Sequence, residues 1–371
     1  MSFTDRLGLS IPQAIAAWLL VLLIGGIAGL FSMLLCNYLL SFGGVDSANK
    51  HGISKVSASR VGGLAIVTYM LMHLGYQFQL GVYQPETGDS TVMMACIAFF
   101  VLGIYEDLQG TLSARARFLV MLVTALATLS ASPDLVLQPV GIGWVDSILS
   151  ASSLVALAFT GICIAFIPNA FNTADGANGL IAGTAVFALA GLTSVADATI
   201  VPFLTAAMVG CLIFLVFNLV SGRFFLGDGG AYFLGALCGL GLIVVSNGSG
   251  VSVWWLLSLV FYPVADLIWS IGRRILARRS PFTPDNQHLH NLLFASLDAG
   301  PMSSMTANTL TGVSIAVLFS GLPVVVAASG FWSVTDDIWL FWVLVQWLLY
   351  GLCWKYLSDR LCALPALEVE T

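Results

Sequence analysis

The sequence predicts an all-α, polytopic integral membrane protein with about eleven transmembrane helices, its N-terminus outside and its C-terminus cytoplasmic. Of its 371 residues, 58% are apolar and only 9% are charged, against about 25% charged residues in a soluble domain. Long apolar runs recur along the whole chain, and almost all basic residues lie between alternate runs. This composition excludes a soluble enzyme and a disordered chain. The net charge of −6 offers no basic surface to a nucleic acid.

The predicted spans are roughly 17–25 residues long, which is the length that crosses a bilayer core as a helix. The first is too long for the apolar segment of a signal peptide, so we expect a retained helix. The spans cover about residues 12–41, 62–82, 91–105, 116–132, 150–168, 179–196, 200–220, 230–246, 252–272, 308–329 and 337–354. Because no repeat or linker is evident, residues 1–371 are predicted to form one transmembrane domain.

Basic residues set the predicted orientation. Twelve of the 13 Lys and Arg residues lie on one side of an eleven-span chain, and only Arg6 lies on the other. Because Lys and Arg are enriched in cytoplasmic loops, that side is predicted to be cytoplasmic. The cytoplasmic loops then cover about residues 42–61, 105–116, 168–179, 221–230 and 273–307.

Two adjacent carboxylates, Glu106 and Asp107, end the third predicted span. They repel each other unless a cation or a basic group lies near them. Such a pair suits Mg²⁺, which takes oxygen ligands, or a general base. The alternative interpretation is a solvated helix end.

The loop between the fifth and sixth spans concentrates amide and carboxylate groups. Asn169, Asn172, Asp175 and Asn178 recur at every third residue, and two glycines among them permit a close backbone approach. An ordinary turn between spans needs few amides, so we interpret this loop as a candidate ligand site.

A glycine-rich turn, Gly227-Asp228-Gly229-Gly230, precedes the eighth predicted span. The N–H groups at a helix N-terminus suit a phosphate. Asp228 would repel that phosphate unless a metal ion lay between them. The turn is therefore interpreted as a metal–diphosphate site, with an ordinary turn between spans as the alternative.

The largest predicted cytoplasmic loop carries His288 and His290 after two arginine pairs. Two histidines without a neighbouring cysteine make an incomplete zinc site, whereas Arg and His side chains suit an anionic diphosphate. The arginines also suit topology anchors. Asp266, inside the ninth span, is interpreted as a functional residue or as the partner of an Arg on a neighbouring helix.

All four clusters lie on the same predicted side of the membrane. Together they imply a cytoplasmic diphosphate substrate handled with Mg²⁺, and an acceptor reached at the bilayer surface, such as a lipid phosphate. A transporter is the competing class. Transporters place ionisable groups near the bilayer midplane, whereas here the acidic residues of the clusters lie at the ends of cytoplasmic loops, and Asp266 is the one acid predicted to lie well inside a span.

From about residue 46 to residue 291 the chain resembles the polyprenyl-phosphate N-acetylhexosamine-1-phosphate transferases. The resemblance rests on the acidic pair, the NxxNxxDGxxGL motif that begins at Asn169, the glycine-rich segment around Asp228, the sequence His288-Leu289-His290, and the sequence Arg60-Val61-Gly62-Gly63. Three positions depart from the family's usual pattern. Glu106 replaces an Asp, Asn178 replaces a second Asp, and Ser54 stands where a His is common.

The resemblance implies a role for each candidate residue. Asp228 and Asp107 are expected to bind Mg²⁺, with Mn²⁺ as a substitute, and Glu106, Asp107 and Asp175 are expected to be catalytic. The residues expected to bind substrate are Arg60, Asn169, Asn172, Asn178, His288 and His290.

The implied reaction transfers a sugar 1-phosphate from a UDP-N-acetylhexosamine to undecaprenyl phosphate and releases UMP. It would start a cell-surface polysaccharide such as an O-antigen. The active site is expected on the cytoplasmic face of a bacterial inner membrane, and a homodimer is compatible with this interpretation. Two alternatives stay open: the muramyl-pentapeptide transferase of lipid I synthesis, and a non-enzymatic membrane transporter or scaffold.

Overall fold

The computed structural model describes residues 62–363 except 80, 82, 86, 223, 249 and 284, together with Ile27, Phe31, Tyr38, Arg60 and two short strands. Most of the first predicted span, and most of the segment from 46 to 60, lie outside the described residues. The elements of the first half are β1 Val45–Asp46 and β2 Ala58–Ser59, which pair antiparallel, α3 Gly62–Gln79, α4 Thr87–Gln109, α5 Ala114–Ala131, the 3₁₀ turn η1 Pro133–Leu135, α6 Gly143–Leu149 and α7 Ser153–Ala174.

The second half is also helical. Its elements are α8 Leu180–Val195, α9 Val201–Ser221, α10 Gly227–Gly248, α11 Val253–Leu259, α12 Phe261–Leu276, α13 Leu289–Asp298, α14 Ser304–Ala316, the π-helical turn η2 Val317–Gly321, α15 Leu322–Ala328 and α16 Ile338–Ala363. Within the described part of the chain, the prediction of a helical multi-span membrane protein is confirmed.

Each predicted span from residue 62 onward coincides with a helix or with a pair of helices. By length and composition, seven helices of the described residues could cross a membrane, or eight if the bent pair α11–α12 counts as one span. The predicted number of eleven is therefore not confirmed, and the orientation stays a prediction. α11 and α12 meet at an angle of 82°, so the ninth predicted span is broken in the middle.

Two predicted loops are partly helical. α4 continues to Gln109, so Glu106 and Asp107 lie in its last turns. α7 runs through Pro168 to Ala174, so Asn169 and Asn172 lie on a helix. The fifth predicted span ends at about residue 168, whereas α7 continues past Pro168 for six more residues.

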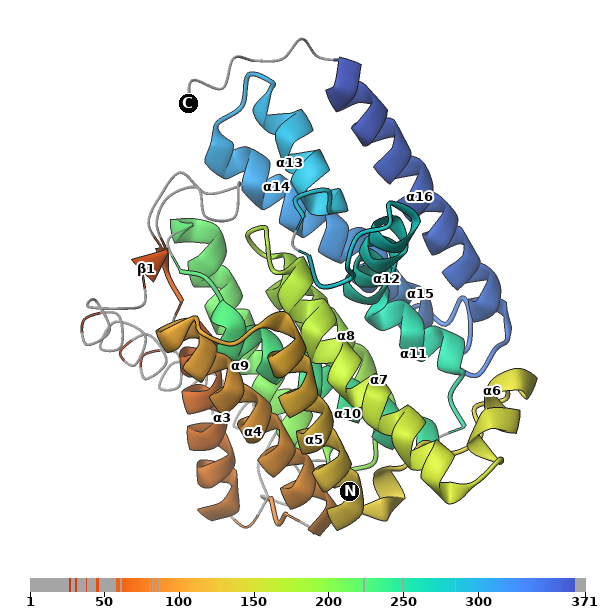
Figure 1. Ribbon diagram of the computed structural model, residues 1–371. Helices are drawn as coiled ribbons and strands as arrows, with labels where there is room; N and C mark the ends of the chain where they lie inside the picture. The colour runs from red at the N-terminus through yellow and green to blue at the C-terminus, as the bar shows by residue number, and fades with distance from the viewer. Residues whose placement is uncertain are drawn as a thin grey trace.

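α10 is the central helix, surrounded by α3, α4, α7 and α8 (Figure 1). In its most apolar stretch, 89% of the residues are buried, against 22% for the peripheral α16. Glycines let neighbouring helices approach it closely. At Gly103 of α4, an added Cβ would lie 2.5 Å from the backbone of Asp228, so this glycine brings the end of α4 against the beginning of α10.

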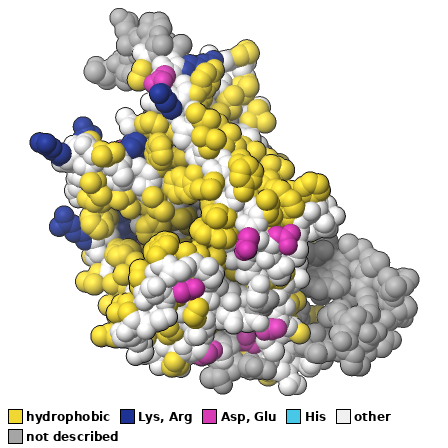
Figure 2. All heavy atoms as spheres, turned by 90° about the vertical axis from the view of Figure 1, so that its right-hand side faces the viewer, with side chains coloured by type: hydrophobic (Ala, Val, Ile, Leu, Met, Phe, Trp, Pro, Cys, Tyr) yellow, Lys and Arg dark blue, Asp and Glu magenta, His cyan; other side chains and the backbone are white. Residues whose placement is uncertain are grey.

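The outer face that carries α16 is covered with apolar side chains (Figure 2). Its Lys and Arg side chains gather toward one end, and most of its acidic side chains lie toward the other. Apolar helix surfaces between two polar ends of opposite charge are the pattern expected of a bilayer-embedded protein.

Candidate active site

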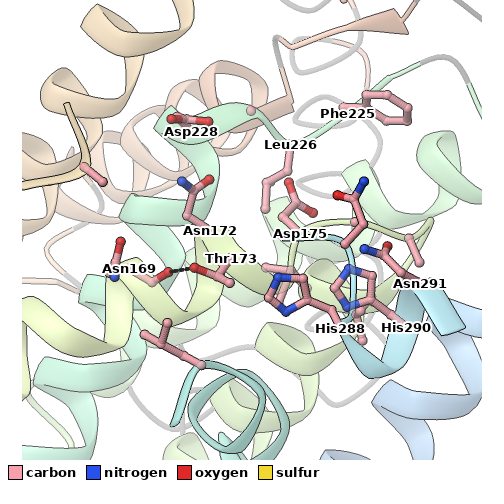
Figure 3. A pocket seen from close by; sticks show the side chains of 18 of the residues that line it. Asn169, Asn172, Thr173, Asp175, Phe225, Leu226, Asp228, His288, His290 and Asn291 are labelled. Atoms are coloured by element: carbon pink, nitrogen blue, oxygen red, sulfur yellow. Dashed lines mark hydrogen bonds between the residues drawn. The ribbon is translucent and has the colours of Figure 1, made fainter. Parts of the chain in front are cut away.

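One cavity of about 720 Å³ brings the candidate residues together. Each of the five predicted cytoplasmic loops contributes to its lining. Of the predicted site residues, those that line it are Arg60, Glu106, Asn169, Asn172, Asp175, Asn178, Asp228, His288 and His290. Asp228 and Asn172 lie on one side of the cavity, and the two histidines lie on the other (Figure 3). Asp107 is the predicted residue that does not line the cavity.

Asp107 caps the N-terminus of α10. Its Oδ1 accepts a hydrogen bond from the backbone N–H of Asp228, and its Oδ2 accepts one from that of Gly229, each at 3.0 Å. A carboxylate at this position also interacts favourably with the helix dipole. The backbone N–H groups that the sequence offered to a phosphate are therefore bound by a side chain of the protein.

Arg117 ties the acidic cluster together. Its Nη1 lies 3.2 Å from Oδ2 of Asp228 and 3.6 Å from Oε1 of Glu106. Arg60 pairs in the same way with Asp107, at 3.5 Å. From the sequence, Arg117 contributes only to the predicted orientation of the chain. Its position inside a predicted span was the signal that could have singled it out.

Asn172 joins this cluster through Tyr232. The Tyr232 hydroxyl donates to Oδ2 of Asp228 at 3.4 Å and accepts from Nδ2 of Asn172 at 3.3 Å. Tyr232 follows Asp228 by four residues, which places both on one face of α10. Tyr232 belongs to the site, although none of the sequence motifs predicted it.

The asparagine-rich loop is anchored from two other helices. The backbone N–H of Asn178 donates to Oδ1 of Asn308 at 2.6 Å, and that of Gly179 donates to Oδ1 of Asn218 at 2.7 Å. Oδ1 of Asn178 and Oδ1 of Asn291 are both buried, and neither has a hydrogen-bond partner among the described residues. Because buried acceptors are normally satisfied, these two cavity-lining groups can accept hydrogen bonds from a ligand.

The histidine loop packs against the asparagine-rich loop. His290 is almost fully buried, and an added Cβ at Gly176 would lie 2.3 Å from its Nε2. Burial lowers the pKa of His290 to about 4, so its ring is neutral near pH 7. Asp266 pairs with His288, and no arginine pairs with it among the described residues, so the alternative of an Asp266–Arg pair is not supported there.

Arg273 and Arg274, predicted for anion binding or anchoring, both contact Asp285 of the same loop. The distances to the Asp285 carboxylate are 3.4 Å from Arg273 and 3.1 Å from Arg274. Partial burial alone would raise the pKa of Asp285, but the hydrogen bond from Arg274 and the charge of Arg273 lower it overall. These ion pairs hold the loop that precedes His288.

The residues present fit a magnesium ion that is shared with a substrate. Among the described residues, no group of three or more His, Cys, Asp or Glu side chains is arranged to hold a metal on its own. Mg²⁺ is commonly bound by one or two carboxylates together with substrate phosphates. Asp228 faces the cavity with 18% of its side chain exposed, whereas both oxygens of Asp107 bind the backbone of α10.

The fold and the cavity define a multi-span helical membrane protein with an acidic and amide-rich pocket at one end of its helices. The sequence model of glycosyl transferase family 4 matches residues 90–246, which include most of α10 and the asparagine-rich loop. Over these residues the chain is similar to this family.

Curated relatives of the chain share between a quarter and a third of their aligned residues with it. A Bacillus subtilis protein named probable undecaprenyl-phosphate N-acetylglucosaminyl 1-phosphate transferase is 27% identical over 69% of this chain and 71% of its own length. An Escherichia coli O157:H7 undecaprenyl-phosphate alpha-N-acetylglucosaminyl 1-phosphate transferase is 25% identical, over 80% and 79%. A Mycobacterium leprae decaprenyl-phosphate N-acetylglucosaminephosphotransferase is 29% identical, over 63% and 66%.

Proposed function

We propose that this protein transfers a sugar 1-phosphate from a UDP-N-acetylhexosamine to undecaprenyl phosphate, releases UMP and thereby starts a cell-surface polysaccharide. One observation carries the proposal. Asp228, Asn172 and the histidine loop line a single cavity in a chain whose relatives are named polyprenyl-phosphate sugar-1-phosphate transferases. We further propose that this cavity opens to the cytoplasm of a bacterial inner membrane.

In this reaction a phosphate oxygen of the lipid attacks the sugar-bearing phosphorus of the donor. A new P–O bond forms, and the bond to the UMP phosphate breaks with its electron pair leaving on UMP. Both reactants are anionic, so the protein must hold them together against their mutual repulsion. A lipid phosphate with a second pKa of about 6 is mostly ionised at pH 7, so the attack needs no strong base.

The cavity offers groups for each part of this task. Asp228, with Asn172 beside it, would hold Mg²⁺, and the bound ion would neutralise charge on the donor diphosphate. Arg117 keeps Asp228 and Glu106 close together. His288 and His290 border the opposite side of the cavity and would contact the donor. Asp175 and the buried side-chain oxygen Oδ1 of Asn178 would also contact the donor.

The acceptor must enter from the bilayer. α12 carries apolar side chains on its exposed face, with Ile268 44%, Ile275 57% and Leu276 86% exposed. On the same helix, Arg274 lines the cavity. We propose that a lipid phosphate approaches along α12, with its tail on these apolar residues and its headgroup toward the cavity.

The test uses purified protein in detergent with undecaprenyl phosphate, Mg²⁺ and a panel of UDP-sugars that includes the muramyl-pentapeptide donor. The expected result is UMP release that requires the lipid, stops with EDTA and is fastest with one N-acetylhexosamine. Preference for the muramyl-pentapeptide donor would assign the protein to lipid I synthesis. No release with any donor, from folded protein, would favour a scaffold.

A further inference from the structure

The histidine loop is supported from behind by α12 and α16. Asp266 on α12 and Tyr350 on α16 are both fully buried. Oδ2 of Asp266 lies 2.5 Å from Nδ1 of His288. Oδ1 of Asp266 accepts hydrogen bonds from the Tyr350 hydroxyl at 2.7 Å and from the backbone N–H of Leu289 at 3.2 Å. One buried carboxylate thus joins two helices to the loop.

α16 contacts the loop at a second point, one helical turn further on. Nε1 of Trp354 donates to the backbone carbonyl of Gln287 at 2.8 Å. The guanidinium of Arg273 lies 5.2 Å from the centre of the Trp354 ring and donates to the same carbonyl. Trp354 and Arg273 therefore both bind the backbone of the residue that precedes His288.

These contacts determine which nitrogen of His288 carries a proton. An ionised carboxylate can only accept hydrogen bonds, so the nitrogen that binds Asp266 must be Nδ1–H. The other nitrogen, Nε2, then lies on the side of Asp285, 3.6 Å from its Oδ1. Both His288 and Asp285 line the cavity.

His290 is held in the opposite tautomer. Its backbone N–H donates to the Tyr262 oxygen at 3.1 Å, and its Nδ1 lies 2.9 Å from the same oxygen. Tyr262 is fully buried, and no other acceptor for its hydroxyl proton is found among the described residues. Because a buried hydroxyl donates its proton, Nδ1 of His290 is the acceptor. Its ring proton is then on Nε2, which faces Gly176.

We propose that Asp266 and Tyr350 are positioning residues that keep a proton on Nδ1 of His288, while Tyr262 keeps the ring proton of His290 on Nε2. Both rings then present Nε2 toward the cavity, and Nε2 of His290 carries its proton. The last helix, α16, lies outside the family match at 90–246, yet it is part of the support of the active site. The effect on turnover rests on the function proposed above, whereas the tautomers do not.

The first experiment compares two Tyr→Phe variants of one helix. Tyr350→Phe removes the hydroxyl that binds Asp266. Tyr356→Phe removes one from a residue that is 65% exposed and serves as the matched control. We expect Tyr350→Phe to lower kcat by about tenfold, as for a lost hydrogen bond to a charged group, and Tyr356→Phe to keep the wild-type kcat. Equal kcat in both variants would overturn a role for α16.

The second experiment reads the tautomers directly and needs no activity. The chain has only four histidines, so ¹⁵N-histidine labelling gives few imidazole signals, which His288→Gln and His290→Gln assign. The expected wild-type result is a protonated Nδ1 on His288 and a protonated Nε2 on His290. In Asp266→Asn, the side-chain amide can donate to Nδ1, which moves the His288 proton to Nε2.

The outcomes separate the two proposals. A His288 that keeps its wild-type tautomer in Asp266→Asn overturns the positioning role, whatever the turnover. If Asp266→Asn does not fold, the Tyr350→Phe comparison and the wild-type spectrum decide. A wild-type protein that shows the expected tautomers but transfers no sugar phosphate counts against the proposed function alone.

Discussion

The two sides of the cavity are built in different ways. On the acidic side, the contacts of Arg117 with Asp228 and Glu106 are 3.2 and 3.6 Å long, and the Arg117 and Asp228 side chains are 25% and 18% exposed. On the histidine side, Asp266 is fully buried and binds His288 and Tyr350 at 2.5 and 2.7 Å. The acidic side is partly exposed and its ion pairs are long, whereas the histidine side is buried and its hydrogen bonds are short.

This difference indicates which side responds to a ligand. Long ion pairs between partly exposed side chains contribute less energy than short, fully buried hydrogen bonds, so a metal ion or a phosphate can replace them. Short hydrogen bonds within a buried network are costly to break. We therefore expect the acidic side to bind and release charge during the reaction, and the histidine side to keep its geometry.

The largest expected effect comes from Asp228→Asn, which removes the carboxylate that faces the cavity and keeps its size. We expect turnover to fall by at least about 10³-fold, because charge neutralisation on the diphosphate is lost. UMP release over a range of Mg²⁺ concentrations measures it, and Asp359→Asn, at an exposed position of α16, is the control. Near-normal turnover in Asp228→Asn would remove the metal assignment.

Asp107→Asn separates support of α10 from metal binding. An amide can accept at only one of its two positions, so one of the N–H groups of Asp228 and Gly229 loses its acceptor. We expect the free energy of unfolding to fall by about 2 kcal/mol, with a smaller loss of turnover than in Asp228→Asn. Unchanged stability together with a higher Mg²⁺ requirement would instead make Asp107 a metal ligand.

The sequence predicted the residue types of the site but not their pairings. Apolar runs predicted the helices, because a lipid environment requires long apolar stretches whose backbone groups are paired internally. The motifs predicted nine of the residues that line the cavity. Arg117 and Asp228 are separated by 111 positions, and Asp266 and Tyr350 by 84. No local pattern relates such residues, since their proximity follows from helix packing.

Proline and glycine positions show the same limit. Proline in a helix interior removes a backbone hydrogen bond, but α7 continues past Pro168, and Gly235 of α10 lets the Pro168 backbone approach closely. A sequence-based rule describes the proline itself, whereas the helix that faces it decides the outcome.

Gly176→Ala is expected to disturb the contact between the two loops. The new methyl group would overlap Nε2 of His290, and overpacking of this kind costs about 1–3 kcal/mol. If the overlap is relieved by displacing His290, the activation free energy rises by a similar amount, and turnover drops by about tenfold. Gly75→Ala is the control, because an added Cβ meets no atom within 4 Å there. Equal turnover in the two variants would contradict a requirement for this loop contact.

The smallest expected effect is a pH dependence of stability that comes from His290. Burial lowers its pKa from 6.5 to about 4 in the folded protein. Between these values the unfolded chain binds a proton that the folded protein does not, so stability falls as the pH falls from about 6.5 to 4. Thermal unfolding in detergent across this range measures the slope. His290→Gln should reduce it, because glutamine does not titrate. An identical slope in wild type and His290→Gln would mean that the folded protein tolerates a charged His290, and the histidine side of the cavity would then be less dry than its hydrogen bonds indicate.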